Sequence, residues 1–220
     1  MFSDQYIIKD VEPLIPNQTV EEALLVLNKL HIDMLPLVDN QKLVNYISYE
    51  NLEGHASNVL LSRIPFFTTV LPFVTPNQHI INVLSQLKTL NLSLLAVLDD
   101  ENNYVGILKT KDIVKALSQS LSVKSQGSII VIRLKPQDFS LSDIVRIIEY
   151  GDAKVLGFFT FEIENSDELE LHLKLSTTFL RNILATLERY EYNVVQYYNR
   201  EDANDDNDWR YEHLMKFIDL

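Results

Sequence analysis

Apolar residues recur at helical spacing in two stretches of the chain that lie sixty residues apart. Each stretch follows the same triplet, Pro-Asn-Gln, at residues 16–18 and again at 76–78. The apolar positions repeat every three or four residues, which places them along one side of a helix. The two stretches are Val20, Ala23, Leu24, Leu27 and Leu30, and then Ile80, Val83, Leu84, Leu87 and Leu90. We therefore expect an amphipathic helix after each triplet.

A pair of short apolar runs follows each predicted helix. The runs are Met34–Val38 with Leu43–Ile47, and Leu94–Leu98 with Tyr104–Leu108. An acidic turn separates the two runs of each pair, which predicts a β-hairpin, and the polar residues that come next predict the start of another helix. One extra residue after Asp99 changes the offset between the copies from 60 to 61. The chain thus contains a duplicated helix-strand-strand-helix unit.

The two copies carry sequence features of a known regulatory module. Leu35-Pro36-Leu37-Val38-Asp39 ends a strand of the first copy, and Gly106-Ile107-Leu108 precedes Asp112 in the second. With this order of elements, residues 1–122 resemble a tandem of CBS domains, the cystathionine-β-synthase-type (Bateman-type) module, with repeats at 1–62 and 63–122. The resemblance implies a disc with two clefts, and such clefts commonly hold AMP, ADP, ATP or S-adenosylmethionine as a regulatory ligand. No cofactor is expected to be required.

The resemblance also implies ligand-binding residues in the second cleft. In the family an Asp at the start of the second helix accepts hydrogen bonds from both ribose hydroxyls, and Asp112 matches that position. Lys109 stands three residues earlier, where the family has Thr or Ser, and its ammonium group suits a phosphate. Thr75, ahead of the second copy's first helix, completes the implied set. The alternative is that Asp112 is simply the N-cap of its helix.

The first copy departs from the family pattern at the matching positions. Ser48 and Asn51 stand where the second copy has Lys109 and Asp112, and Asn45 replaces the glycine. We therefore expect the first cleft to be degenerate.

A second domain is predicted after residue 128. Residues 118–128 are rich in Ser and Gln, which is typical of a linker. Beyond them, the apolar pattern over residues 128–200 predicts strand, helix, strand, strand, helix, strand. That order is the ferredoxin-like βαββαβ plan, a four-stranded antiparallel sheet with two helices on one face. The fold class is then α/β for the repeats and α+β for this domain.

Behind a CBS pair, such a domain resembles an ACT-like domain. The layout of residues 1–200 is similar to acetoin-utilisation-type CBS-ACT proteins. The resemblance implies a homodimer and an amino-acid effector loop, which here holds Asp138, Phe139 and Ser140. The alternative is that Asp138 or Ser140 caps the helix that follows. Residues 201–220 are expected to be an acidic linker and an amphipathic helix with Trp209, His213, Leu214, Phe217 and Ile218 on one side.

Composition excludes several classes of function. The formal net charge of -12 argues against a nucleic acid or an anionic membrane as partner. The absence of cysteine removes thiolate chemistry and the usual structural zinc sites, and the five histidines show no metal-ligand spacing. No stretch has the pattern of a signal peptide or a membrane span, so we expect a cytoplasmic protein.

The search for catalytic motifs is negative. The five glycines permit no GxGxxG, P-loop or GxSxG motif, and no catalytic residue can be assigned. The sequence therefore predicts a non-enzymatic regulatory protein that binds a small metabolite, an adenine nucleotide, between CBS repeats and acts on a protein partner that the sequence does not identify. The alternative is a ligand-free scaffold whose degenerate clefts serve dimerisation and partner binding.

Overall fold

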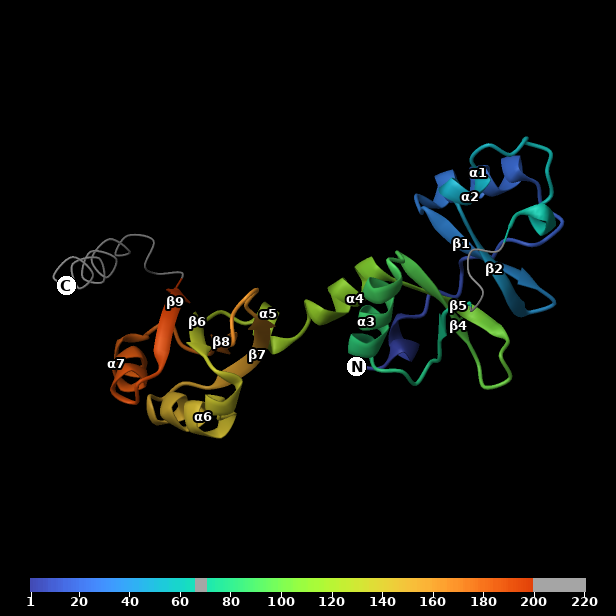
Figure 1. The fold of residues 1–220 in the computed structure, drawn as a ribbon. Helices are drawn as coiled ribbons and strands as arrows, with labels where there is room; N and C mark the ends of the chain where they lie inside the picture. Colours follow the sequence, from blue (N-terminus) through green and yellow to red (C-terminus); the bar gives the residue numbers. More distant parts are fainter. Residues whose placement is uncertain (66–70, 200–220) are drawn as a thin grey trace. The chain divides into compact units, whose positions relative to one another are not determined.

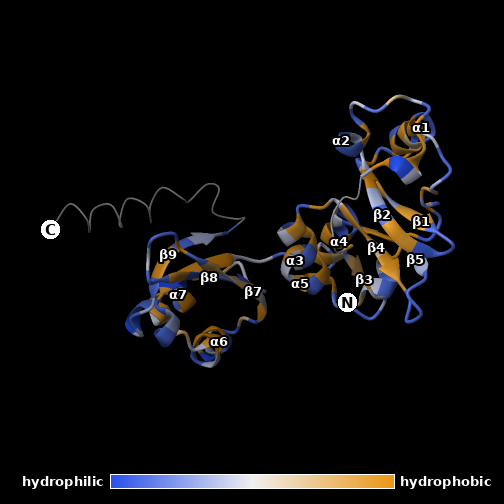
Figure 2. Cartoon of the chain, turned by 45° about the vertical axis from the view of Figure 1, so that its right-hand side comes forward, coloured by the Kyte–Doolittle hydropathy of each residue, from blue (hydrophilic) through white to orange (hydrophobic). Residues whose placement is uncertain are grey.

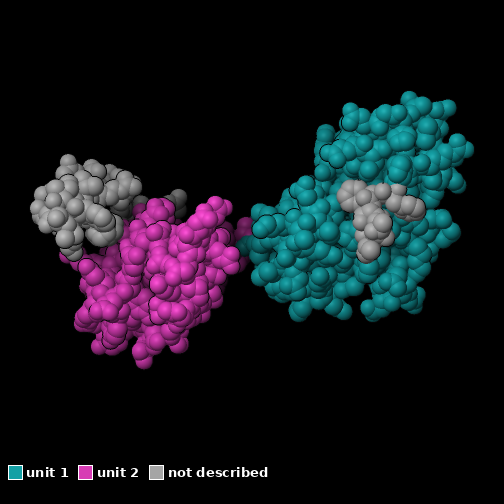
Figure 3. Space-filling view, viewed as in Figure 1, with its two compact units in different colours: residues 1–117 teal, residues 118–220 magenta. Residues whose placement is uncertain are grey.

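The computed structural model describes residues 1–65 and 71–199. The chain divides into two compact units, Met1–Leu117 and Ser118–Leu220, which Figure 3 colours separately. The segment 201–220, predicted as an acidic linker and a helix, lies outside the described residues. Each unit is described here by itself.

The duplicated helices and strands occur at the predicted places in unit 1 (Figure 1). The elements of the first repeat are α1 (Val20–Leu30), β1 (Met34–Asp39), β2 (Lys42–Ser48) and α2 (Tyr49–Leu52). Those of the second repeat are β3 (Phe73–Val74), α3 (Ile80–Leu90), β4 (Leu94–Leu98), β5 (Tyr104–Lys109) and α4 (Thr110–Leu117). Two 3-10 helices, Ser3–Tyr6 and Leu61–Arg63, complete the unit. The helix predicted at the end of the first repeat is only one turn long.

Local sequence signals fix the ends of α1 and α3. Thr19 and Glu22 form a capping box at the start of α1, in which the Glu22 carboxylate accepts from the Thr19 N–H at 2.7 Å. At the C-termini, His31 and Asn91 adopt the left-handed conformation with φ of 52° and 53°. These two residues are sixty positions apart, so the duplication extends to the helix stops.

The strands of unit 1 form two small sheets around one core. β1 and β2 pair antiparallel, while β4 lies between β3, to which it is parallel, and β5, to which it is antiparallel. Residues 1–19, which precede α1 and are called here the N-terminal lead-in, reach the second repeat. Ile8 in this segment exchanges backbone hydrogen bonds of 2.9 and 3.1 Å with Ile107. A single apolar cluster joins residues of both repeats, among them Leu27, Leu87 and Leu108.

Gly106 permits this close approach of the lead-in. A Cβ atom at residue 106 would lie 2.5 Å from the Ile8 carbonyl oxygen and 2.8 Å from Ile7 Cγ2. Both distances are shorter than real Cβ contacts. The glycine of the family pattern therefore has a packing role in this chain.

Unit 2 contains the predicted order of strands and helices. Its elements are α5 (Leu121–Lys124), β6 (Ile129–Leu134), α6 (Leu141–Tyr150), β7 (Val155–Glu162), β8 (Leu169–Leu175), α7 (Arg181–Arg189) and β9 (Asn193–Tyr198), with a 3-10 turn at Pro136–Asp138. All pairs in the four-stranded sheet are antiparallel, and the strand order is β7-β8-β6-β9. The alternate apolar residues of β6 and β8 pack with α6 and α7 in a second core, visible as orange strands and helices in Figure 2.

The segment predicted as a linker is partly ordered. The short helix α5 forms inside the Ser- and Gln-rich stretch and contacts β7. A Cβ atom at Gly157 of β7 would lie 2.6 Å from Ser122 Cβ, so the two segments touch closely. The contact with β7 accounts for the order, since the composition of the stretch does not favour a helix.

Candidate functional site

The junction of β5 and α4 holds the residues that the sequence assigned to the second cleft. β5 ends at Lys109 and α4 begins at Thr110. The Thr110 N–H and hydroxyl both donate to the carbonyl oxygen of Ser93, at 2.9 and 3.1 Å. These bonds anchor the start of α4 to the segment before β4 and fix the direction in which its first turn points.

Asp112 has an unsatisfied oxygen at this junction. The residue is the third of α4, so it is not the N-cap that the alternative interpretation required. Its Oδ2 atom is buried and has no hydrogen-bond partner among the described residues. An unsatisfied buried polar atom costs about 1–3 kcal/mol, and more when it is charged. A ligand that donates a hydroxyl to this oxygen would remove that cost.

Lys109 interacts with three charged neighbours at this junction. Burial and the nearby Lys111 lower the pKa of Lys109, while the charges of Asp112 and Asp10 act in the opposite direction. Asp10 belongs to the lead-in and was missed by the sequence analysis. The pairing of Ile8 with Ile107 brings the lead-in along β5 and toward Lys109. The junction therefore combines groups that attract phosphate with a carboxylate that opposes it.

Thr75 lies in a different set of contacts. Its carbonyl oxygen accepts from Ser3 Oγ at 2.7 Å and from the Gln78 N–H at 3.1 Å. Ser3 is buried and also donates to the Pro76 carbonyl oxygen. Within residues 1–65 and 71–199, no hydrogen bond joins Thr75 to Lys109 or Asp112.

The matching polar residues of the first repeat bond to their own neighbours. Ser48 and Asn51 form a capping box, in which Asn51 Oδ1 accepts from the Ser48 N–H at 3.1 Å and from its hydroxyl at 2.8 Å. Asn45 is buried, and its amide group donates to the Pro65 carbonyl oxygen at 3.2 Å and accepts from the Tyr46 N–H at 2.9 Å. These internal bonds occupy polar groups that a ligand would otherwise meet.

The loop between β6 and α6 uses two of its three candidate side chains inside the fold. Phe139 packs against the core of unit 2. Ser140 occupies the N-cap position of α6 but makes no capping bond, because its hydroxyl donates to Asp143 Oδ2 at 2.7 Å. Asp138 is exposed in the preceding 3-10 turn. Neither Asp138 nor Ser140 caps the helix with its side chain, contrary to the alternative interpretation.

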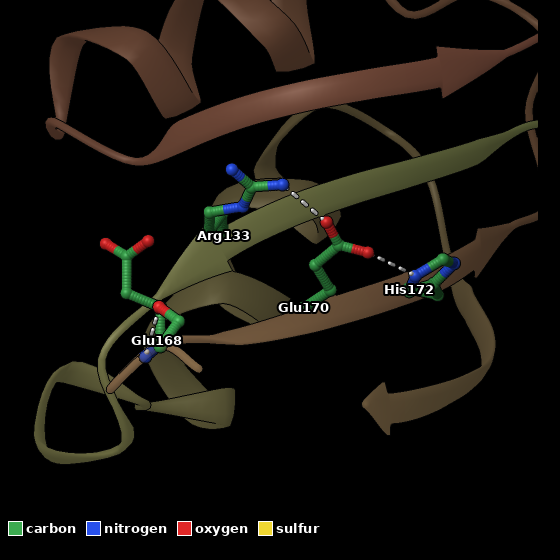
Figure 4. A network of polar contacts seen from close by, with 5 residues as sticks. Arg133, Glu168, Glu170 and His172 are labelled. Atoms are coloured by element: carbon green, nitrogen blue, oxygen red, sulfur yellow. Dashed lines mark hydrogen bonds and ion pairs between the residues drawn. The ribbon is translucent and has the colours of Figure 1, made fainter. Parts of the chain in front are cut away.

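A polar group of three residues crosses the sheet of unit 2 (Figure 4). Arg133 Nη2 lies 2.8 Å from Glu170 Oε1, and His172 Nε2 lies 3.4 Å from Glu170 Oε2. Both neighbours lower the pKa of Glu170, with the Arg133 hydrogen bond as the larger cause. His172 is half-buried, and its ring packs edge-on against the ring of Phe161.

The described residues hold neither a metal-binding group of side chains nor a membrane-spanning helix. Over residues 1–65 and 71–199, no three or more His, Cys, Asp or Glu side chains are grouped so that they could hold a metal ion. In the same part of the chain, no helix has both the length and the apolar character needed to cross a membrane.

Comparisons with known proteins agree with the duplicated architecture. The CBS domain family matches residues 4–55 and 62–119, which together make up half of the chain. An uncharacterized protein of Methanocaldococcus jannaschii, MJ0188, is 25% identical over 126 residues, which cover 57% of this chain and 48% of that protein. Inosine-5'-monophosphate dehydrogenase of the same organism is 27% identical over 140 residues, covering 62% of this chain and 28% of the enzyme.

A solved structure shares the fold at lower identity. Protein MJ1004 of Methanocaldococcus jannaschii superposes with a TM-score of 0.50 at 20% identity, over 56% of this chain and 62% of that one. The chain spans less than half the length of the two curated relatives given above. On the family match and the two repeats seen in unit 1, the chain belongs to the CBS-domain family, with a tandem pair over residues 4–119.

Proposed function

We propose that this chain is a non-enzymatic regulatory protein that binds an adenine nucleotide at the β5–α4 junction of its second CBS repeat. The observation that supports the proposal is the buried Oδ2 atom of Asp112, which lacks a partner within the described part of the chain. The two hydroxyls of a ribose are donors of the kind this oxygen lacks. The family resemblance assigns that contact to the same position.

The charged groups at the junction affect how many phosphates the nucleotide can carry. Lys109 is within electrostatic range of Lys111, Asp112 and Asp10, so the junction holds two ammonium groups and two carboxylates. A monophosphate carries less negative charge than a triphosphate and needs fewer positive groups to balance it, so we propose AMP or ADP ahead of ATP. S-adenosylmethionine, which is cationic at sulfur, would instead interact favourably with Asp10.

Unit 2 is proposed to be an ACT-like domain with the ferredoxin-like plan. Its strand order β7-β8-β6-β9 and its two helices on one face support this assignment. We further propose that the protein is a homodimer formed through CBS surfaces, sheet edges or both. β7 is an edge strand of eight residues, and an uncovered edge of that length favours pairing with another chain.

Regulation would follow from a shift between conformations. A nucleotide that binds one arrangement of the repeats more tightly than another increases the population of that arrangement by its difference in affinity. The partner protein would then recognise the favoured arrangement.

Thermal unfolding with AMP, ADP, ATP and S-adenosylmethionine tests the ligand proposal. At about a hundred times its dissociation constant, a nucleotide should stabilise the protein by about 2.7 kcal/mol. Asp112→Ala should abolish most of the shift in melting temperature, and Lys109→Ala should weaken ADP and ATP more than adenosine. The matched control is Asn51→Ala, the equivalent position of the first repeat, which should keep the nucleotide shift even though it loses its capping box.

The opposite outcome is also informative. If none of the four ligands raises the melting temperature at millimolar concentration, the adenosyl proposal is wrong, and the ligand-free scaffold becomes the better account of the CBS pair. If the ligands act but Asp112→Ala keeps the full shift, the protein is a sensor whose site lies elsewhere.

A further inference from the structure

One face of the sheet in unit 2 carries no long helix, and the short helix α5 packs on it beside Gly157, at one end of β7. Residues of β6 and β8 that contact α6 and α7 alternate with residues that point to the opposite side. Cross-strand pairs extend that opposite side to β7 and β9, because directly paired residues share a face. We call this side the free face and define it by Val131, Arg133, Phe159, Phe161, Glu170, His172, Lys174, Gln196 and Tyr198.

The free face exposes aromatic rings beside a charged centre. Phe159 and Phe161 are 59% and 53% exposed, and their ring centroids lie 6.5 Å apart. Phe161 lies against His172 of the group formed with Arg133 and Glu170, at 4.9 Å between ring centroids, and Phe159 is paired with His172 across the two strands. The buried Nε of Arg133 has no acceptor among the described residues. An apolar patch of this kind next to an unsatisfied donor is typical of a surface that is covered in the working protein.

We propose that the chain's own C-terminal segment, residues 209–220, docks on the free face. The sequence of this segment places Trp209, Leu214, Phe217 and Ile218 at helical spacing, and Trp209 is the only tryptophan of the chain. Such a stripe needs an apolar surface, and the two exposed phenylalanines provide one.

The point at which the described chain ends suits this proposal. β9 lies beside β6, and its last residue, Tyr198, belongs to the free face. The Asn199 side chain donates to the Thr178 carbonyl oxygen, and this bond holds the chain in place just after β9. Ten further residues lead to Trp209, and an extended chain of that length reaches about 33 Å. Crossing the sheet from β9 to β7 requires only three strand spacings, about 14 Å.

Charge complementarity supports this segment as the occupant, and tethering favours it over the same segment of a second copy. The connecting residues 201–208 contain five acidic side chains, while β6 and β8 present Arg133, His172 and Lys174 toward the free face against the single acid Glu170. A segment joined by a short linker samples a nearby surface at a millimolar effective concentration, on the order of a thousand times that of a micromolar protein. The chain's own segment therefore competes successfully with a neighbour's.

Fluorescence of Trp209 tests the proposal in the full chain. Selective excitation of the native protein should give emission at a shorter wavelength than in urea and weak quenching by acrylamide. Phe159→Glu and Phe161→Glu should move the emission toward the urea value while the far-ultraviolet circular dichroism stays native. The matched control is Tyr150→Glu, which replaces an aromatic side chain 89% exposed at the end of α6, on the helical side of the sheet.

Three outcomes decide the matter. Native emission equal to that in urea, or emission that the phenylalanine variants do not change, overturns the proposal. A short-wavelength emission that is lost on dilution also overturns it, because a second copy then supplies the segment. If the glutamate variants do not fold, deletion of residues 209–220 gives an independent test: the dye ANS should bind the shortened chain more strongly, and Phe161→Ser should reduce that binding.

Discussion

The hydroxyl of Tyr46, in the first repeat, accepts a 2.9 Å hydrogen bond from the backbone N–H of Ala96, in the second. The same hydroxyl donates to the Pro72 carbonyl oxygen at 2.6 Å, so one side chain satisfies two backbone groups at the start of the β3–β4 pair. Tyr46 is completely buried, and that burial raises the pKa of its phenol. Sixty residues before Ala96 stands Pro36, which has no N–H to satisfy. The bridge therefore has no counterpart in the first repeat.

Tyr46→Phe should destabilise unit 1 by about 1–3 kcal/mol, because it leaves a buried N–H without an acceptor. Urea unfolding followed by circular dichroism measures the loss. Tyr49→Phe is the control, since the Tyr49 hydroxyl donates to Asn28 at the surface and its removal should cost about 0.5 kcal/mol or less. Equal losses in the two variants would contradict the assigned role of Tyr46.

Gly106→Ala should loosen the N-terminal lead-in. The added methyl group meets the Ile8 carbonyl oxygen at 2.5 Å, and backbone cannot move aside as a flexible side chain does. We expect faster hydrogen exchange at the amides of Ile8 and Ile107 and a lower melting temperature. Gly54→Ala is the comparison, because Gly54 has a φ of 81° but nothing within 4 Å of its Cβ position. Gly54→Ala should lose stability only through backbone strain, on the order of 1 kcal/mol.

Unit 2 should lose stability in acid through Glu170. Its pKa is lowered in the folded protein by Arg133 and His172. A carboxyl group with a lowered folded pKa stabilises the fold fully above its unfolded pKa of about 4.3, and loses that contribution as the pH falls through the folded value. Glu170→Gln should therefore flatten the dependence of the urea midpoint on pH below about 4.3. Glu162→Gln, at an exposed position of β7, should leave it unchanged.

Local patterns were sufficient to predict the repeated elements. The apolar spacing placed α1 and α3, and an alternating pattern placed the strands of unit 2, since each depends only on residues a few positions apart. The sequence placed Asp112 at the start of α4 but could not separate the N-cap from the first turn, because a motif gives the neighbourhood of a helix start and not its first residue.

The features that depend on contacts between residues far apart in the chain were missed by the sequence analysis. Asp10 reaches Lys109 only because the lead-in pairs with β5, and α5 forms only because β7 offers Gly157 as a contact surface. The alternating pattern of residues along β8 likewise carries no information about the contact between the rings of His172 and Phe161, which lie on different strands. Contacts across the fold are set by tertiary packing, which single-sequence periodicity does not record.

The pairing of Ile8 with Ile107 also determines the order in which the protein can be completed during synthesis. Residue 8 leaves the ribosome long before residue 107, so the lead-in must wait for the strand that receives it. The N–H and carbonyl groups of Ile8 lack these partners until β5, the last strand of the second repeat, has been translated. A pairing across ninety-nine residues also lengthens the mean sequence separation of contacts, which slows folding. The first repeat is thus synthesised before the second, yet its N-terminal segment can pair only after β5 of the second repeat has been made.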